Sequence, residues 1–232
     1  MGTTIVQLAG GREAKVVRLG SPGGRVVLYF HSPASSGEEL DGAAEEAARE
    51  LGIELVTIVR RSLAAHASGR FIETVASDVD LLVKTLGLES VTVLGWSGGA
   101  PYALAASEWL GPVVSAVHLV SPLPGPLIGP DAVPHQTERL QQIATTSPTS
   151  SWVAAPGALR DYTAIAAPWP FDVHSVVQPV TIWAPTEDDI VPPQLVDHLA
   201  RQFPCAETVN VPGSHGWIMA NWSTVFQRIA TP

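Results

Sequence analysis

The chain has 232 residues and a formal charge of −9 at pH 7, with 46% hydrophobic and 15% charged residues. This length suits one α/β domain with a large buried core. The acidic balance and the absence of a basic patch argue against nucleic acids and anionic membrane surfaces as partners, because both attract clustered cations. The sequence contains no apolar run near the roughly 20 residues that span a bilayer. A single cysteine, Cys205, and an N-terminus without a signal-peptide pattern favour a cytoplasmic protein with no internal disulfide.

Short apolar runs alternate with helical patterns along the chain, which is typical of a doubly wound α/β sheet. We predict strands at residues 4–8, 13–18, 25–30, 53–59, 90–95, 114–121, 179–184 and 206–211. We predict helices at residues 37–51, 70–86, 98–110, 193–203 and 217–229. Residues 9–11 are expected to close a hairpin, and Ser36 with Glu39 is expected to form a capping box for the first helix.

The interval between the sixth and seventh predicted strands is much longer than a helical crossover requires. It begins with a stretch rich in proline and glycine, which suits a segment that leaves the sheet without forming a helix. We therefore predict a core of residues 1–121 and 179–232 with a cap of residues 122–178. Short helices are expected in the cap near 135–146 and 157–166.

The fifth predicted strand runs directly into Gly95-Trp96-Ser97-Gly98-Gly99 and then into a helical segment. A Gly-x-Ser-x-Gly turn between a strand and a helix lifts the serine hydroxyl out of the sheet, and the glycines let neighbouring backbone pass closely. Ser97 is therefore the candidate nucleophile. The amide of Gly98 lies at the start of the helix, where it favours a developing oxyanion.

A serine nucleophile needs a histidine base and a group that orients the base. The seventh predicted strand opens into the acidic segment 187–189, and the eighth is followed by Gly213-Ser214-His215-Gly216. The chain order is thus serine, acid and histidine, which is the order associated with one serine-hydrolase fold.

These motifs, together with Phe30-His31-Ser32-Pro33 after the third strand, resemble those of the α/β-hydrolase superfamily. The chain is most similar in pattern to small bacterial serine hydrolases with a short cap, which include esterases, lactonases and proline iminopeptidases. The resemblance implies a mostly parallel eight-stranded sheet flanked by helices, with the cap inserted before the strand that carries the acid. The family pattern of an acid four residues before proline places the acid at Asp188, with Glu187 and Asp189 as close alternatives.

The resemblance also implies an oxyanion hole, in which His31 supports the loop and Gly98 supplies the first donor. The loop departs from the family pattern because Ser32 and Pro33 follow His31 directly, without the usual glycine. Pro33 has no N–H group. The second donor is therefore expected from the backbone or hydroxyl of Ser32, or from Ala34 after a shift.

Four tryptophans are expected near the substrate together with His31. Trp152 and Trp169 belong to the predicted cap and are candidates for the roof of an apolar pocket. Trp96 and Trp217 are candidates for substrate contact because Trp96 lies beside Ser97 in the sequence and Trp217 lies near His215. No group of His, Cys, Asp and Glu has metal-ligand spacing, so we predict no metal and no cofactor.

The sequence therefore predicts a serine hydrolase that acts through an acyl-enzyme on a carboxylic ester, lactone or thioester with an apolar acyl part. One alternative keeps the triad but performs lyase, carbon–carbon bond-cleaving or cyclising chemistry, and an altered oxyanion loop would fit it. A peptidase is a further alternative, for which Glu138 and Asp161 are weak candidates to bind a substrate amine. A non-catalytic ligand-binding protein with an idle triad is another. The expected partner is a small-molecule substrate, and the sequence leaves the oligomeric state open.

Overall fold

The computed structural model describes residues 2–8, 11–33, 35, 37, 39–60, 71–125, 161 and 164–231. Its centre is an eight-stranded sheet in the order β1-β2-β4-β3-β5-β6-β7-β8. The strands are β1 (Gly2–Leu8), β2 (Arg12–Gly20), β3 (Arg25–Phe30), β4 (Ile53–Ile58), β5 (Val91–Trp96), β6 (Val114–Val120), β7 (Val180–Pro185) and β8 (Ala206–Val211). β2 pairs antiparallel with β1 and with β4, and the other neighbours pair parallel. The prediction of a mostly parallel eight-stranded sheet is confirmed.

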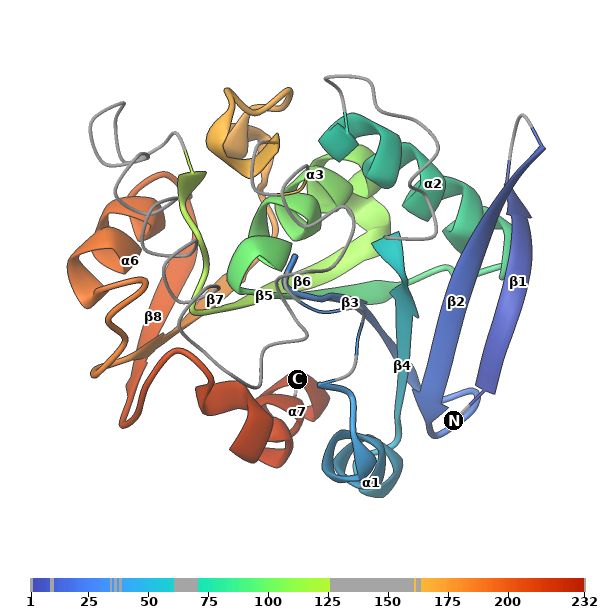
Figure 1. The fold of residues 1–232 in the computed structure, drawn as a ribbon, viewed down its shortest axis with the longest axis horizontal. Helices are drawn as coiled ribbons and strands as arrows, with labels where there is room; N and C mark the ends of the chain where they lie inside the picture. The colour runs from blue at the N-terminus through green and yellow to red at the C-terminus, as the bar shows by residue number, and fades with distance from the viewer. Residues whose placement is uncertain are drawn as a thin grey trace.

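Helices cover both faces of this sheet (Figure 1). The α-helices are α1 (Gly42–Glu50), α2 (Phe71–Thr85), α3 (Ala100–Leu110), α6 (Pro193–Ala200) and α7 (Trp222–Ala230). The 3-10 turns are η3 (Ser97–Gly99), η4 (Gly111–Val113), η6 (Val173–Ser175) and η7 (Trp217–Ala220). Figure 1 shows α1 and α7 on one side of the sheet, and α2 and α3 on the other.

Each central strand contributes side chains to two separate cores. In β5, Val93 packs in the core beneath α2 and α3, whereas Leu94 and Trp96 pack in the core with α1 and α7. Burial on both faces explains why the parallel strands read as continuous apolar runs in the sequence. Because the carboxyl ends of parallel strands meet at one edge of the sheet, the residues that follow β3 to β8 gather at that edge.

The first helix begins later than predicted, and the expected capping box is not formed. Asp41 is the N-cap of α1, and its side chain accepts hydrogen bonds from the amides of Ala43 and Ala44 at 3.0 and 3.1 Å. Glu39 is instead buried and accepts a hydrogen bond from the Tyr29 hydroxyl at 2.7 Å. Ser36 lies outside the described residues. The prediction was wrong because the helix begins at Gly42, where the Asp41 side chain accepts from the first free amides.

Two further differences concern the last helix and the cap. The helix expected at 217–229 is divided into η7 and α7, with Asn221 between them at φ −134°. The cap helix expected at 135–146 lies outside the described residues. The structure describes only part of the second cap helix, expected at 157–166, and there residues 161 and 164–166 are helical. The division into core and cap stays a prediction. Within the described ranges, no helix combines the length and apolarity needed to cross a membrane.

Candidate active site

Ser97 lies at the sharp turn between β5 and α3 and has a positive φ of 54°. The neighbouring glycines leave room for this turn. A Cβ atom on Gly99 would lie 2.0 Å from the carbonyl oxygen of Phe30, and one on Gly95 would lie 2.8 Å from the Cβ of Ala103. Both distances are too short for any side chain, so the two glycines are required by the close approach of β3 and α3 to the turn.

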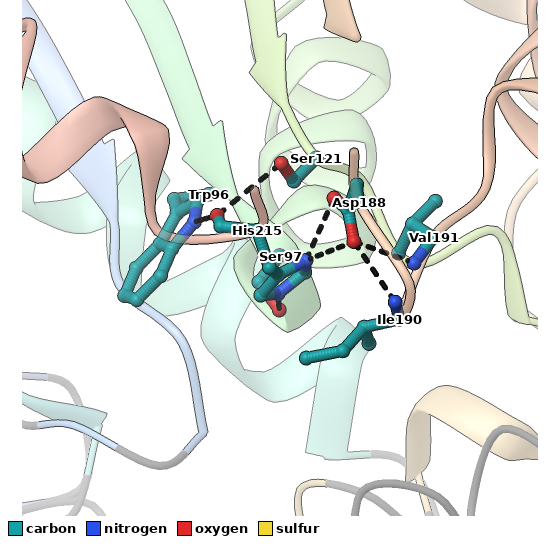
Figure 2. Close-up of polar contacts among 7 residues, drawn as sticks. All are labelled: Trp96, Ser97, Ser121, Asp188, Ile190, Val191 and His215. Carbon is teal, nitrogen blue, oxygen red and sulfur yellow. Dashed lines mark hydrogen bonds and ion pairs between the residues drawn. The ribbon is translucent and has the colours of Figure 1, made fainter. Parts of the chain in front are cut away.

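The structure brings Ser97, His215 and Asp188 together (Figure 2). In the chain, Ser97 lies 118 residues before His215, and Asp188 lies 27 residues before it. The Nε2 atom of His215 lies 2.8 Å from Ser97 Oγ, and its Nδ1 atom lies 2.9 and 3.1 Å from the two carboxylate oxygens of Asp188. A carboxylate can only accept, so Nδ1 carries the ring proton and Nε2 is left to accept from the serine hydroxyl. This is the tautomer that a general base needs.

Asp188 is 3% exposed, and its carboxylate is held by several donors. The amides of Ile190 and Val191 donate to Oδ1 at 3.0 and 2.8 Å, which gives the acid a backbone cradle (Figure 2). Burial alone raises the pKa of Asp188, but the hydrogen bond and charge interaction with His215, together with the Val191 amide and the Ser121 hydroxyl, outweigh it. The pKa therefore lies below its ordinary value, and the side chain is ionised at neutral pH. Of the three acids considered, Glu187 and Asp189 are exposed.

The backbone carbonyl of His215 accepts two side-chain hydrogen bonds. Trp96 Nε1 donates at 3.1 Å and Ser121 Oγ at 3.3 Å (Figure 2). Trp96 is 3% exposed and belongs to the core beside α1 and α7. Strand alternation places Trp96 on the face of that core, where its indole holds the His215 loop, and contact of Trp96 with substrate stays a prediction.

The loop that follows β3 lies against the nucleophile turn. A Cβ atom on Gly98 would lie 2.5 Å from Pro33 Cδ and 2.9 Å from Ile165 Cδ1, so both side chains touch the Gly98 backbone. Gly98 lies in the first turn of the helical run that begins at Ser97, where the first amides have no acceptor in a preceding turn. Ser32 is buried beside Pro33, and its carbonyl oxygen accepts from the Ser35 amide at 3.1 Å. Ser32 as the second oxyanion donor stays a prediction, and Ala34 lies outside the described residues.

His31 acts as a buried structural link in this loop. Its Nδ1 atom lies 2.8 Å from the Ser32 carbonyl oxygen, and its Nε2 atom accepts from the Arg60 amide at 3.3 Å. Since one ring nitrogen donates and the other accepts, the ring is neutral. These contacts fit support of the loop, whereas direct contact with substrate stays a prediction.

Sequence reasoning missed the importance of Arg60, the residue that holds His31. Arg60 is 1% exposed, and its Nη2 donates to the His31 carbonyl at 2.7 Å. Its Nε pairs with Asp161 Oδ2 at 3.1 Å, and its guanidinium lies 4.4 Å from the centre of the Tyr102 ring. Asp161 is thus engaged with an arginine, which removes the support it offered for a peptidase that binds a substrate amine. The 101 residues between Arg60 and Asp161 hid this pair from the sequence.

The remaining tryptophans have different surroundings. Trp217 stacks on Trp183 with ring centres 5.6 Å apart. Trp169 stacks on Phe171 at 5.2 Å and donates to the carbonyl of Ile165 at 3.0 Å. Trp169 therefore supports Ile165, whose side chain touches Gly98. Trp152 lies outside the described residues, and contact of Trp169 or Trp217 with substrate stays a prediction.

The described part of the chain has two other features that bear on where a ligand could bind. It contains no group of three or more His, Cys, Asp or Glu that could hold a metal ion. A hollow of about 540 Å³ lies at the amino ends of the strands, where Arg25, Ser115, Val180 and Ala206 line it. It occupies the opposite edge of the sheet from Ser97, so it is not the place where the triad would act.

No family model matches the chain, and no curated relative matches it. Several solved structures, however, match nearly the whole chain. An esterase from Exiguobacterium antarcticum superposes with a TM-score of 0.75 at 18% identity, covering 100% of this chain and 98% of the esterase. A putative non-heme bromoperoxidase from Mycobacterium tuberculosis H37Rv gives 0.72 at 16% identity, covering 93% of both chains. The enol-lactonase from Burkholderia xenovorans LB400 gives 0.71 at 13% identity, covering 97% of this chain and 98% of the lactonase.

These neighbours share the eight-stranded architecture over nearly the full length of the chain. The expected mostly parallel eight-stranded sheet flanked by helices agrees with this comparison. The chain therefore has the α/β-hydrolase fold.

Proposed function

We propose that the protein is a serine hydrolase that acts through an acyl-enzyme on a carboxylic ester, lactone or thioester with an apolar acyl part. The observation that carries this proposal is the contact of 2.8 Å between Ser97 Oγ and His215 Nε2. The base is oriented in turn by an ionised, buried Asp188. A nucleophile, a base and an orienting acid in hydrogen-bond contact are what acyl transfer to serine requires.

In the first half of the reaction, Ser97 Oγ attacks the acyl carbon while His215 Nε2 takes its proton. The negative charge that develops on the substrate oxygen is stabilised by the Gly98 amide at the start of the helix, with Ser32 as the second donor. The tetrahedral intermediate collapses to an acyl-serine when His215 returns the proton to the leaving oxygen or sulfur. Asp188 stabilises the imidazolium that exists between these two transfers.

In the second half, water replaces the leaving group. His215 removes a proton from the water, which attacks the acyl carbon of the acyl-serine. Collapse of the second tetrahedral intermediate releases the carboxylic acid, and His215 returns the proton to Ser97 Oγ. Each proton that the base takes is returned, so the enzyme ends in its starting state.

The apolar acyl preference is supported by the side chains that touch the nucleophile turn. Pro33 and Ile165 both lie against Gly98 and present carbon atoms to it. The stacked pair of Trp169 and Phe171 backs Ile165. The fold neighbours named as esterases and as an enol-lactonase agree with this substrate class.

The altered oxyanion loop favours a second reaction class as the main rival. Pro33 packs on Gly98 but has no N–H to donate, and loss of one oxyanion donor costs about 3 to 4 kcal/mol of transition-state stabilisation in other enzymes. A triad-bearing enzyme with lyase, carbon–carbon bond-cleaving or cyclising chemistry would fit this altered loop.

The test is hydrolysis of p-nitrophenyl esters from acetate to octanoate by the native protein and by Ser97→Ala. We expect turnover that is lost in the variant, with the highest kcat/KM on a medium or long acyl chain. Equal rates in the two proteins, with no labelling of Ser97 by a fluorophosphonate, would overturn the proposal. Labelling of Ser97 without ester turnover would favour the rival reaction class.

A further inference from the structure

We propose that Trp96 and Ser121 are positioning residues that clamp the backbone carbonyl of His215 and so hold the imidazole between Ser97 and Asp188. The inference rests on the proposed function of the triad. It assigns a role to Trp96, which precedes the nucleophile, and to Ser121, which follows β6, and neither residue takes part in proton transfer.

The loop that carries His215 needs an external anchor. It lies between Gly213, which has φ +123°, and Gly216, and glycines give a backbone wide conformational freedom. The neighbouring carbonyls of Ser214 and Gly216 accept from amides of the next turn, those of Trp217 and Met219. Among the described residues, the donors to the His215 carbonyl are instead the side chains of Trp96 and Ser121 (Figure 2).

Trp96 links the nucleophile and the base directly. It is adjacent to Ser97 in the chain, is 3% exposed, and donates its indole N–H to the His215 carbonyl at 3.1 Å. A buried indole N–H is costly to leave without an acceptor, so this contact fixes both partners. Any shift of the turn that carries Ser97 Oγ is therefore accompanied by a shift of the base, which preserves the 2.8 Å contact between them.

Ser121 links the base and the acid. It follows β6, is fully buried, and has φ +46°, a conformation that side-chain-bearing residues rarely adopt. Its amide donates to the Trp183 carbonyl at 3.0 Å, which secures its backbone to β7. Its single hydroxyl proton is shared between the His215 carbonyl, with Ser121 Oγ 3.3 Å from the carbonyl oxygen, and the Asp188 carboxylate, whose ionised form it favours. Glycine would meet the backbone requirement with less strain, so the serine points to a need for its hydroxyl at this position.

Trp96→Phe tests the first half of the clamp, because it removes the N–H and keeps an aromatic ring in the core. Trp222→Phe is the matched control. Trp222 is 2% exposed in the same core, and its Nε1 has no partner among the described residues, so the change removes similar atoms without removing a hydrogen bond. We expect kcat on a p-nitrophenyl ester to fall between about 10- and 100-fold in Trp96→Phe, with little change in KM, since small displacements of a catalytic group cost rates of this order. Trp222→Phe should retain the native kcat.

Ser121→Ala and Ser121→Gly separate the hydroxyl from the backbone conformation. Both remove the hydroxyl, but glycine adopts φ +46° without the strain that the Cβ of serine or alanine causes. If the hydroxyl positions His215, both variants lose kcat, although Ser121→Gly is the more stable of the two. Ser107→Ala is the control, because Ser107 is equally buried and its hydroxyl bonds a helix carbonyl in α3.

The low-field proton NMR signal of the His215 Nδ1–H reports the geometry of the base independently of turnover. We expect it to shift or broaden in Trp96→Phe and in both Ser121 variants, and to stay unchanged in the two controls. Native turnover with equal kcat and equal spectra in all five variants would overturn the clamp but leave the proposed function intact. A native protein that shows neither turnover nor fluorophosphonate labelling would overturn the proposed function itself.

Discussion

Burial of His118 couples the stability of the fold to pH in a way that one substitution can test. His118 lies in the middle of β6, is 4% exposed, and its Nδ1 has no partner among the described residues. Burial, assisted by the positive charge of Arg228, lowers its pKa from the ordinary 6.5 to about 4. Arg25 and Glu207 line the same hollow, and Glu207 pairs with Arg228. His118→Leu removes the titrating group and keeps a buried side chain of similar size.

The sign of the effect follows from which state binds the proton. Between pH 6.5 and pH 4 the unfolded chain protonates this histidine and the folded chain does not, so stability falls as the pH is lowered through this window. One pKa unit corresponds to about 1.4 kcal/mol, which gives a limiting loss of about 3 kcal/mol and a loss of about 2 kcal/mol by pH 5. Above pH 6.5 this histidine is neutral in both states and contributes no pH dependence.

Urea unfolding of the native protein and His118→Leu at pH 7.5 and pH 5 measures this difference. The native protein should lose about 2 kcal/mol more than the variant between the two conditions. At pH 7.5 the variant should be at least as stable, because the substitution removes a buried polar atom without a partner. His174→Leu, which alters an exposed histidine, is the control for the loss of an imidazole at the surface. Equal pH dependence in the native protein and His118→Leu would refute the reasoning.

Three further predictions concern the site and its support. Gly98→Ala would place a Cβ 2.5 Å from Pro33 Cδ, so we expect kcat/KM on p-nitrophenyl esters to fall about 100-fold as the oxyanion donors separate, and unchanged activity would contradict the assigned donor. Arg60→Met leaves the buried Asp161 carboxylate without its cation and should cost about 3 to 5 kcal/mol in urea unfolding, with part of the loss recovered when Asp161→Leu is added. Asp188→Asn should lower kcat about 10⁴-fold, because an amide no longer holds the tautomer of the base, and a loss under tenfold would argue that another acid orients it.

The sequence predicted those parts of the fold and site whose causes are local. Strand bounds agree with the structure within two residues because buried parallel strands are short continuous apolar runs. The turn at Ser97 could be placed because its Gly-x-Ser-x-Gly pattern lies directly between an apolar strand and a helix, although the contact that requires Gly99 is with Phe30 in β3. The resemblance to the family pattern of an acid four residues before proline implied Asp188, and this residue contacts His215 in the structure.

Contacts between distant segments could not be predicted. Trp96 and His215 are 119 residues apart, and nothing near either one indicates that the indole would meet the His215 carbonyl. Adjacency to Ser97 suggested a substrate contact for Trp96, whereas the two-residue period of β5 already places it on the same face as Leu94. The first helix shows a different limit, because the patterns at Ser36 and at Asp41 both satisfy the rules for a helix start and only packing decides between them.

Trapping the acyl-enzyme tests the central claim most directly. The native protein and Ser97→Ala are mixed with p-nitrophenyl butyrate, quenched in acid within the first turnovers, digested and analysed by mass spectrometry. We expect a butyryl group on the peptide that contains Ser97 in the native protein, and none on that peptide in Ser97→Ala. Release of p-nitrophenol by the native protein without any acyl group on Ser97, or with the acyl group on another residue in both proteins, would contradict the central claim.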